Sequence, residues 1–166
     1  MFALKPISHS SIEMALAKAE RYRLLNEPNE AESICRDILA VEPENRQARI
    51  ILVLALTDEI PQEPGAFANA MTAIASLEAD YDRAYYYGIA WERRAKACCA
   101  ADAPGSSDYA YDWIVKALHF FEEAECLRPE GHDDPILRWN TCVRFLERHK
   151  ELRPKTEEVP EPILSE

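Results

Sequence analysis

Two stretches of the sequence place small residues, large residues and a final proline at the same spacing. They are NEAESICRDILAVEP (29–43) and KALHFFEEAECLRP (116–129). Residues three and four apart lie on one face of an α-helix, so each stretch predicts an amphipathic helix that ends near a proline. The shared positions follow offsets of four, three and five residues: Ala31, Cys35, Ile38 and Pro43 in one stretch, and Ala117, Phe121, Ala124 and Pro129 in the other.

The composition favours one helical domain. Hydrophobic residues make up 48% of the 166 positions and only 4 are glycine, which is typical of helical packing rather than of strands and turns. The formal net charge of −11 argues against a nucleic-acid partner or an anionic membrane surface, both of which need clustered Lys and Arg. The odd number of cysteines, five, indicates free thiols and a cytoplasmic location.

Helical periodicity extends along almost the whole chain, and no strand pattern remains. We therefore expect an all-α fold with about seven helices. Pro28 stands where a helix can begin, and Ser107 or Asp108 is placed to cap the sixth helix. The expected helices cover about 10–26, 28–41, 45–59, 66–78, 81–101, 109–128 and 133–149.

The small-then-aromatic pair Ala19 and Tyr22 in the first helix recurs as Gly88 and Trp91 in the fifth. Together with the closing prolines, this pattern resembles the tetratricopeptide repeat, a helix–turn–helix unit of about 34 residues. The resemblance implies a right-handed α-α superhelix of stacked antiparallel helix pairs. It implies a single domain over 1–150, with units of about 12–45, 46–80 and 81–131 and a capping helix over 133–149. The remaining residues, 151–166, are rich in proline and acidic residues and lack a helical period, so we expect them to form a tail.

Candidate chemical sites are few. His132, Asp133 and Asp134 could suggest a metal site, but polar residues beside a helix start are what capping requires, and no zinc-ligand spacing supports them. The adjacent Cys98 and Cys99 point about 100° apart on a helix, which favours packing. The sequence shows no catalytic arrangement and no phosphate loop. We therefore expect no catalytic residue, no metal and no cofactor, and a protein that is not an enzyme.

In proteins with this repeat, the first helix of each unit lines a concave groove. The resemblance thus implies a non-enzymatic adaptor whose apolar, acidic-edged groove binds another protein or peptide, apolar or basic in character. The alternatives are that the chain itself fills the groove, that Tyr85 and Trp91 serve a small-molecule sensor, or that Trp139, Phe145 and Leu146 mediate a homodimer in a self-associating structural module. The expected groove residues are Glu13, Leu16, Glu20, Arg23, Gln47, Ile50, Leu54, Asp58, Asp82, Tyr85, Ile89 and Glu92.

Overall fold

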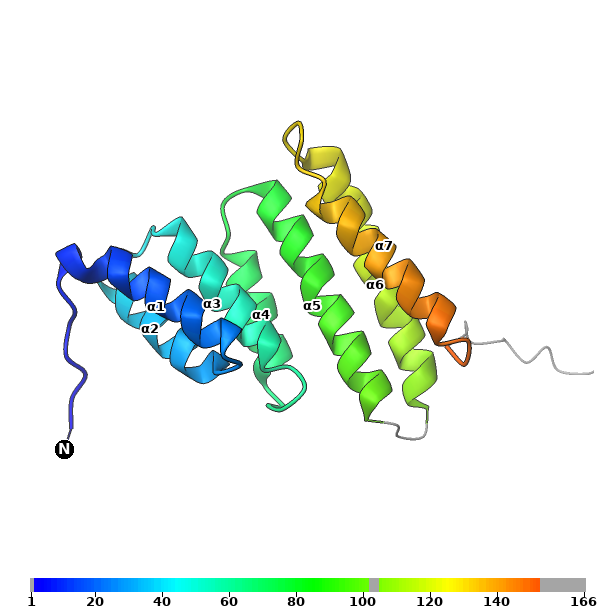
Figure 1. The fold of residues 1–166 in the computed structure, drawn as a ribbon, viewed down its shortest axis with the longest axis horizontal. Helices are drawn as coiled ribbons and strands as arrows, with labels where there is room; N and C mark the ends of the chain where they lie inside the picture. The colour runs from blue at the N-terminus through cyan, green and yellow to red at the C-terminus, as the bar shows by residue number, and fades with distance from the viewer. Residues whose placement is uncertain (1, 102–104, 153–166) are drawn as a thin grey trace, which may run out of the picture.

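The computed structural model describes residues 2–101 and 105–152. Within these residues the chain forms helices only, without a strand, which confirms the all-α class (Figure 1). A short 3-10 turn, His9–Ser11, comes first. The seven α-helices that follow are α1 (Ile12–Leu24), α2 (Pro28–Val41), α3 (Arg46–Asp58), α4 (Ala66–Ala75), α5 (Asp80–Ala100), α6 (Ser106–Leu127) and α7 (Asp134–Arg148).

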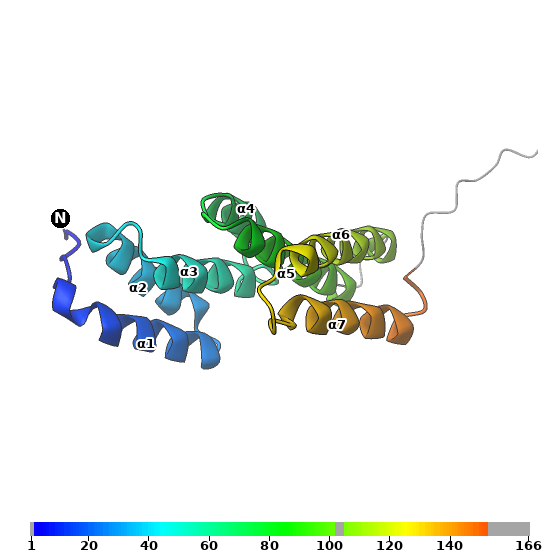
Figure 2. The same ribbon diagram turned by 90° about the horizontal axis from the view of Figure 1, so that it is seen from above.

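Each helix packs against the next one along the chain, and the odd-numbered helices also contact one another in the order α1, α3, α5, α7. Figure 2 shows α1 and α7 on the same side of the molecule, with α3 and α5 between them and α4 and α6 on the opposite side. We call the surface along α1, α3, α5 and α7 the odd-helix face.

Several helix starts follow from local sequence. Pro28 begins α2, as predicted, because its fixed φ angle suits the first helical turn and its missing N–H costs no helical bond there. Asn45 caps α3 by accepting a hydrogen bond from the backbone N–H of Ala48 over 2.8 Å. Pro135 lies in the first turn of α7.

One expected cap is wrong, and another is correct in position only. Helix α6 begins at Ser106, before Ser107 and Asp108, and its cap position is Gly105, whose φ of 78° lies in the left-handed region that glycine tolerates. Asp133 takes the cap position of α7, but its side chain accepts no capping hydrogen bond. Its carboxylate instead lies 3.6 Å from the guanidinium of Arg128.

The small and large residues of the two opening stretches lie in the core. Ala31, Cys35 and Ile38 on α2 are fully buried, and so are Ala117, Phe121 and Ala124 on α6. The hydrophobic interior is built as successive clusters between neighbouring helices rather than around one centre.

None of the described helices is both long and apolar enough to cross a lipid bilayer. Leu152, at the end of the described residues, is buried against the cluster between α5, α6 and α7. Most of the expected tail, 153–166, lies outside the residues that the structure describes.

Candidate functional site: a charge cluster on the odd-helix face

The residues predicted to line a groove come from α1, α3 and α5, but not all of them offer surface. Side chains that are exposed or half-buried include those of Arg23, Tyr85 and Asp58. The interpretation of the whole set as an accessible groove needs correction, because packing between neighbouring helices buries four of its members: Leu16, Asp82, Ile89 and Glu92.

Asp58, in the last turn of α3, is shared by two arginines. Its Oδ2 lies 2.8 Å from Nε of Arg23 on α1, and its Oδ1 lies 2.6 Å from Nη1 of Arg93 on α5. Arg93 also donates to the backbone carbonyl of Leu54 over 3.1 Å and to the Thr57 hydroxyl. These contacts join three helices through one carboxylate.

Glu92 on α5 is also shared by two cations. It is 1% exposed, and a buried carboxylate needs compensating positive charge. Lys96, one turn further along α5, pairs with its Oε1. Arg138 of α7 lies 3.5 Å from its Oε2 but forms no hydrogen bond with it, so that oxygen has no hydrogen-bond partner among the described residues.

Arg93, Lys96, Arg138 and Arg23, together with Asp58 and Glu92, form what we call the charge cluster. Four cations and two carboxylates leave two positive charges in excess, in a chain whose formal net charge is −11. Burial lowers the pKa of Arg93, and the neighbouring charges of Arg23 and Arg138 lower it further, whereas Asp58 and Glu92 act in the opposite direction.

Tyr85 and Asp82 extend the line of polar contacts along α5. Burial raises the pKa of the Tyr85 phenol, and the neighbouring Arg138 acts in the opposite direction. Asp82 is balanced by a single cation, because Arg46 of α3 donates to it from Nε over 3.0 Å and from Nη2 over 2.7 Å. The acidic groups expected at the groove edge are thus neutralised where they come from α3 and α5.

An open pocket of about 330 Å³ lies beside the cluster, between α3 and α5. Its polar lining comes from Thr57, Asp58, Arg93 and Lys96, and its apolar lining from Pro61, Ala97 and Ala100. A pocket of this size admits a small molecule with a charged group at one end.

A second pocket, of about 350 Å³, lies between α2, α3 and α4. Its two arginines have no surplus charge, because Arg36 pairs with Glu32, and Arg49 pairs with both Glu44 and Glu78. Charge therefore favours the pocket at the charge cluster as the binding site for an anion.

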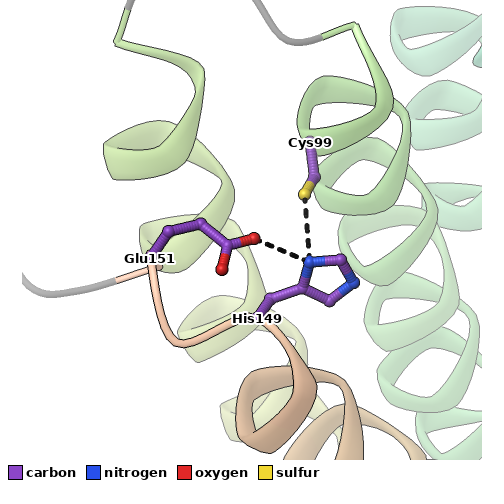
Figure 3. Close-up of side chains that lie close together, drawn as sticks. All are labelled: Cys99, His149 and Glu151. Atoms are coloured by element: carbon purple, nitrogen blue, oxygen red, sulfur yellow. Dashed lines mark hydrogen bonds and ion pairs between the residues drawn. The ribbon is translucent and has the colours of Figure 1, made fainter.

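Another polar group lies further along the seam between α5 and α7. Figure 3 shows Cys99, from the end of α5, and Glu151, beyond the end of α7, both directed at the same ring nitrogen of His149. The Cys99 Sγ lies 3.8 Å from Nδ1 of His149, and Oε1 of Glu151 lies 2.8 Å from it. The pKa of Glu151 is lowered, first by a backbone hydrogen bond and then by His149.

One carboxyl group titrates far from its usual range. Glu59 follows α3 and is 5% exposed, and its Oε1 has no hydrogen-bond partner among the described residues. Burial, with added contributions from Glu32 and Glu63, raises the pKa of Glu59 to about 7, although Arg36 acts in the opposite direction.

Sequence reasoning included Arg23, Asp58 and Glu92 but missed Arg93, Lys96 and Arg138. A signal for one of them was present. Arg23 and Asp58 lie 35 residues apart, and Arg93 follows Asp58 after the same interval. This interval is close to the period of the expected repeat, so alternating charges at equivalent positions could have indicated the ion pairs.

Comparison with known proteins gives one informative similarity. Over 87 residues, which are 52% of this chain, the sequence is 30% identical to a (5-formylfuran-3-yl)methyl phosphate synthase from Methanopyrus kandleri. The match covers 35% of that enzyme, so the chain spans about a third of the length of the curated relative it matches. The sequence matches no family model, and no solved structure matches it.

This similarity overturns two expectations. The chain was expected not to be an enzyme, and to act as a non-enzymatic adaptor or as a self-associating structural module. Those expectations are wrong on this finding, because the protein that the chain resembles is a biosynthetic enzyme. Both expectations rested on the lack of a short catalytic motif in the sequence. A group of side chains drawn from α1, α3, α5 and α7, such as the charge cluster, leaves no such motif.

Proposed function

We propose that this chain is a biosynthetic enzyme, or the helical part of one, that binds a small phosphorylated substrate at the charge cluster. The observation that carries the proposal is the sharing of each of two carboxylates, Asp58 and Glu92, by two cations. Asp58 forms ion pairs with two arginines, and Glu92 faces Lys96 and Arg138. The two surplus positive charges match the charge of a phosphate monoester near neutral pH.

The chemistry of the cations supports the choice of phosphate. The planar guanidinium of an arginine presents paired donors that match phosphate oxygens, and lysine adds a compact charge. Arg93 and Lys96 line the pocket and lie one helical turn apart. Glu92 keeps Arg138 as a partner when Lys96 turns toward a ligand. The similar enzyme from Methanopyrus kandleri is named for a product that carries a phosphate ester.

We further propose that the helices form the right-handed superhelix expected from the tetratricopeptide resemblance, with the odd-helix face as its concave side. The contacts in the order α1, α3, α5, α7 support this arrangement, as do the ion pairs at 35-residue intervals. No disulfide joins any of the five cysteines, all of which lie among the described residues, and this supports a cytoplasmic location. A protein or peptide partner, or a second copy of the chain, stays a prediction.

The enzymatic role is tested by incubating the purified protein with a mixture of small cellular metabolites and following each compound by mass spectrometry. We expect at least one phosphorylated compound to be consumed and a new one to appear. Lys96→Met should slow this conversion, because it removes a pocket cation while Glu92 keeps Arg138. The matched control Lys18→Met removes an exposed lysine of α1 and should change nothing. A mixture left unaltered by the wild-type protein would contradict the proposal.

A further inference from the structure

The group formed by Cys99, His149 and Glu151 is separate from the charge cluster and carries an inference of its own. Each residue offers one atom that commonly binds metals: a thiolate sulfur, an imidazole nitrogen and a carboxylate oxygen. These three atoms lie within 4.8 Å of one another. From the geometry we infer that Cys99, His149 and Glu151 form a Zn²⁺ site with three protein ligands and an open fourth position.

The alternative chemistry for these residue types is a nucleophilic cysteine activated by a histidine and an acid. In that arrangement the nucleophile and the acid contact opposite nitrogens of the imidazole ring, so that a proton can pass from one side to the other. Here the Sγ of Cys99 and the Oε1 of Glu151 both approach Nδ1 (Figure 3). Convergence of three ligand atoms on one point suits a metal ion and does not suit a proton relay.

The distances fit a zinc ion after small side-chain rotations. Zinc binds sulfur at about 2.3 Å and nitrogen or oxygen at about 2.0–2.1 Å, so tetrahedral ligands lie about 3.6 Å (S to N) and about 3.3 Å (N to O) apart. The corresponding separations here are 3.8 Å and 2.8 Å. The side chain of Glu151 is 60% exposed and has room to make the larger adjustment.

The surrounding structure holds the ligands in place. The ring of His149 packs on the ring of Phe145, with 4.3 Å between their centroids. The backbone N–H of His149 donates to the Phe145 carbonyl over 3.0 Å. The turn that carries Glu151 is closed by a hydrogen bond from the N–H of Leu152 to the His149 carbonyl. Leu152 is itself buried. Supported ligands of this kind reduce the cost of ordering a metal site.

The ligand set favours zinc over other ions. Thiolate and imidazole ligands suit zinc, whereas magnesium and calcium select oxygen ligands alone. A metal at this position would connect the end of α5 to the end of α7. Because the metal binds the folded state, its binding should raise the unfolding temperature of the protein.

Cobalt titration tests the site directly, because a thiolate bound to Co²⁺ gives a near-ultraviolet charge-transfer absorption. The full chain is reduced, stripped of metals with a chelator, and titrated first with Co²⁺ alone and then with Zn²⁺. We expect saturable thiolate-to-cobalt absorption, its loss on displacement by Zn²⁺, and a higher unfolding temperature with Zn²⁺. Absence of that absorption in the wild-type protein would overturn the inference.

Variants assign the ligands. Cys99→Ser should abolish the charge-transfer absorption, and His149→Gln should weaken binding about tenfold or more, at least as much as the loss of an outer-shell partner does. Glu151→Gln alters an exposed side chain without disturbing the core and should also weaken binding. Matched controls are Cys126→Ser and His132→Gln, both at exposed positions, and Cys98→Ser, at the neighbouring cysteine.

The controls should bind Co²⁺ like the wild type. The inference is overturned if absorption persists in Cys99→Ser, if it depends on Cys98 instead, or if His149→Gln and Glu151→Gln both keep the wild-type affinity. Circular dichroism of each variant verifies that the helices are intact before the titration. The result does not depend on the proposed enzymatic role, because the readouts are absorption and thermal stability.

Discussion

Gly88 of α5 lies directly against the ring of Phe121 of α6, so closely that a β-carbon at position 88 would be 2.5 Å from Cε1 of that ring. Phe121 is fully buried, and α5 and α6 are in extensive contact. The pair therefore explains the size pattern of the sequence. A position without a side chain on one helix admits the large side chain of its neighbour.

Gly88→Ala should destabilise the protein by about 1–3 kcal/mol, because the added methyl group cannot fit beside Phe121 without displacing its ring. Urea unfolding followed by circular dichroism measures this change. The matched control is Gly65→Ala, whose new β-carbon would meet only Asn69, at 4.0 Å. That substitution should change the free energy of unfolding by less than about 0.5 kcal/mol.

The double variant Gly88→Ala/Phe121→Leu identifies the cause. Leucine lacks the ring atoms that meet the new methyl group, so the two substitutions should cost about 1 kcal/mol less together than the sum of their separate costs. Additive costs would mean that α5 and α6 are packed in a different register.

The repeated size pattern predicted these packed positions well, because close packing acts between residues at fixed helical spacing. Ala31, Cys35 and Ile38, and their counterparts on α6, are all buried as expected. The cap of α6 could not be predicted in this way. Serine and aspartate are common caps, but Gly105 takes the position because the backbone there has a φ of 78°.

The charge cluster could be predicted only in part. Arg23, Asp58 and Arg93 lie at equal intervals in the sequence, so a search for opposite charges one repeat apart would have found them. Arg138 pairs with Glu92 across a different interval. Cys99 and His149 are 50 residues apart, and no short motif links them. Such pairs form only when α7 packs against α5.

Asp58→Asn should destabilise the protein by about 1–3 kcal/mol, because two partly buried arginines lose the carboxylate that they share. The substitution keeps the size of the side chain, so the loss reports charge rather than packing. Urea unfolding of the variant checks it. Asp112→Asn, at an exposed position of α6, is the matched control and should be nearly neutral. Equal stability of the two variants would mean that the shared carboxylate adds nothing.

Glu59 makes the stability of the protein depend on pH. Its pKa is about 7 in the folded protein, against 4.5 for an ordinary glutamate. The folded state therefore holds the proton more tightly, and the stability that this provides is present at low pH and is lost as the pH rises from about 4.5 through about 7. The loss is of the order of 3 kcal/mol.

Glu59→Gln should remove this dependence, because glutamine stays neutral at every pH. The variant should match the wild type near pH 4.5 and exceed its stability near pH 8, as measured by urea unfolding at each pH. Glu122→Gln is the matched control, because Glu122 is exposed on α6. It shows how far the stability changes with pH when an exposed carboxylate of this acidic chain is removed. If the wild type and Glu59→Gln keep a constant difference in stability across this range, Glu59 does not titrate as described.

The central claim is that the surplus charge at the cluster binds a phosphate ester, and a calorimetric titration with a small phosphate monoester and its unphosphorylated alcohol tests it most directly. The wild-type protein and Lys18→Met should bind the ester and bind the alcohol far more weakly. Lys96→Met should lose about tenfold in affinity for the ester, equivalent to about 1.4 kcal/mol. Equal affinity for ester and alcohol, or an unchanged affinity in Lys96→Met, would contradict the account.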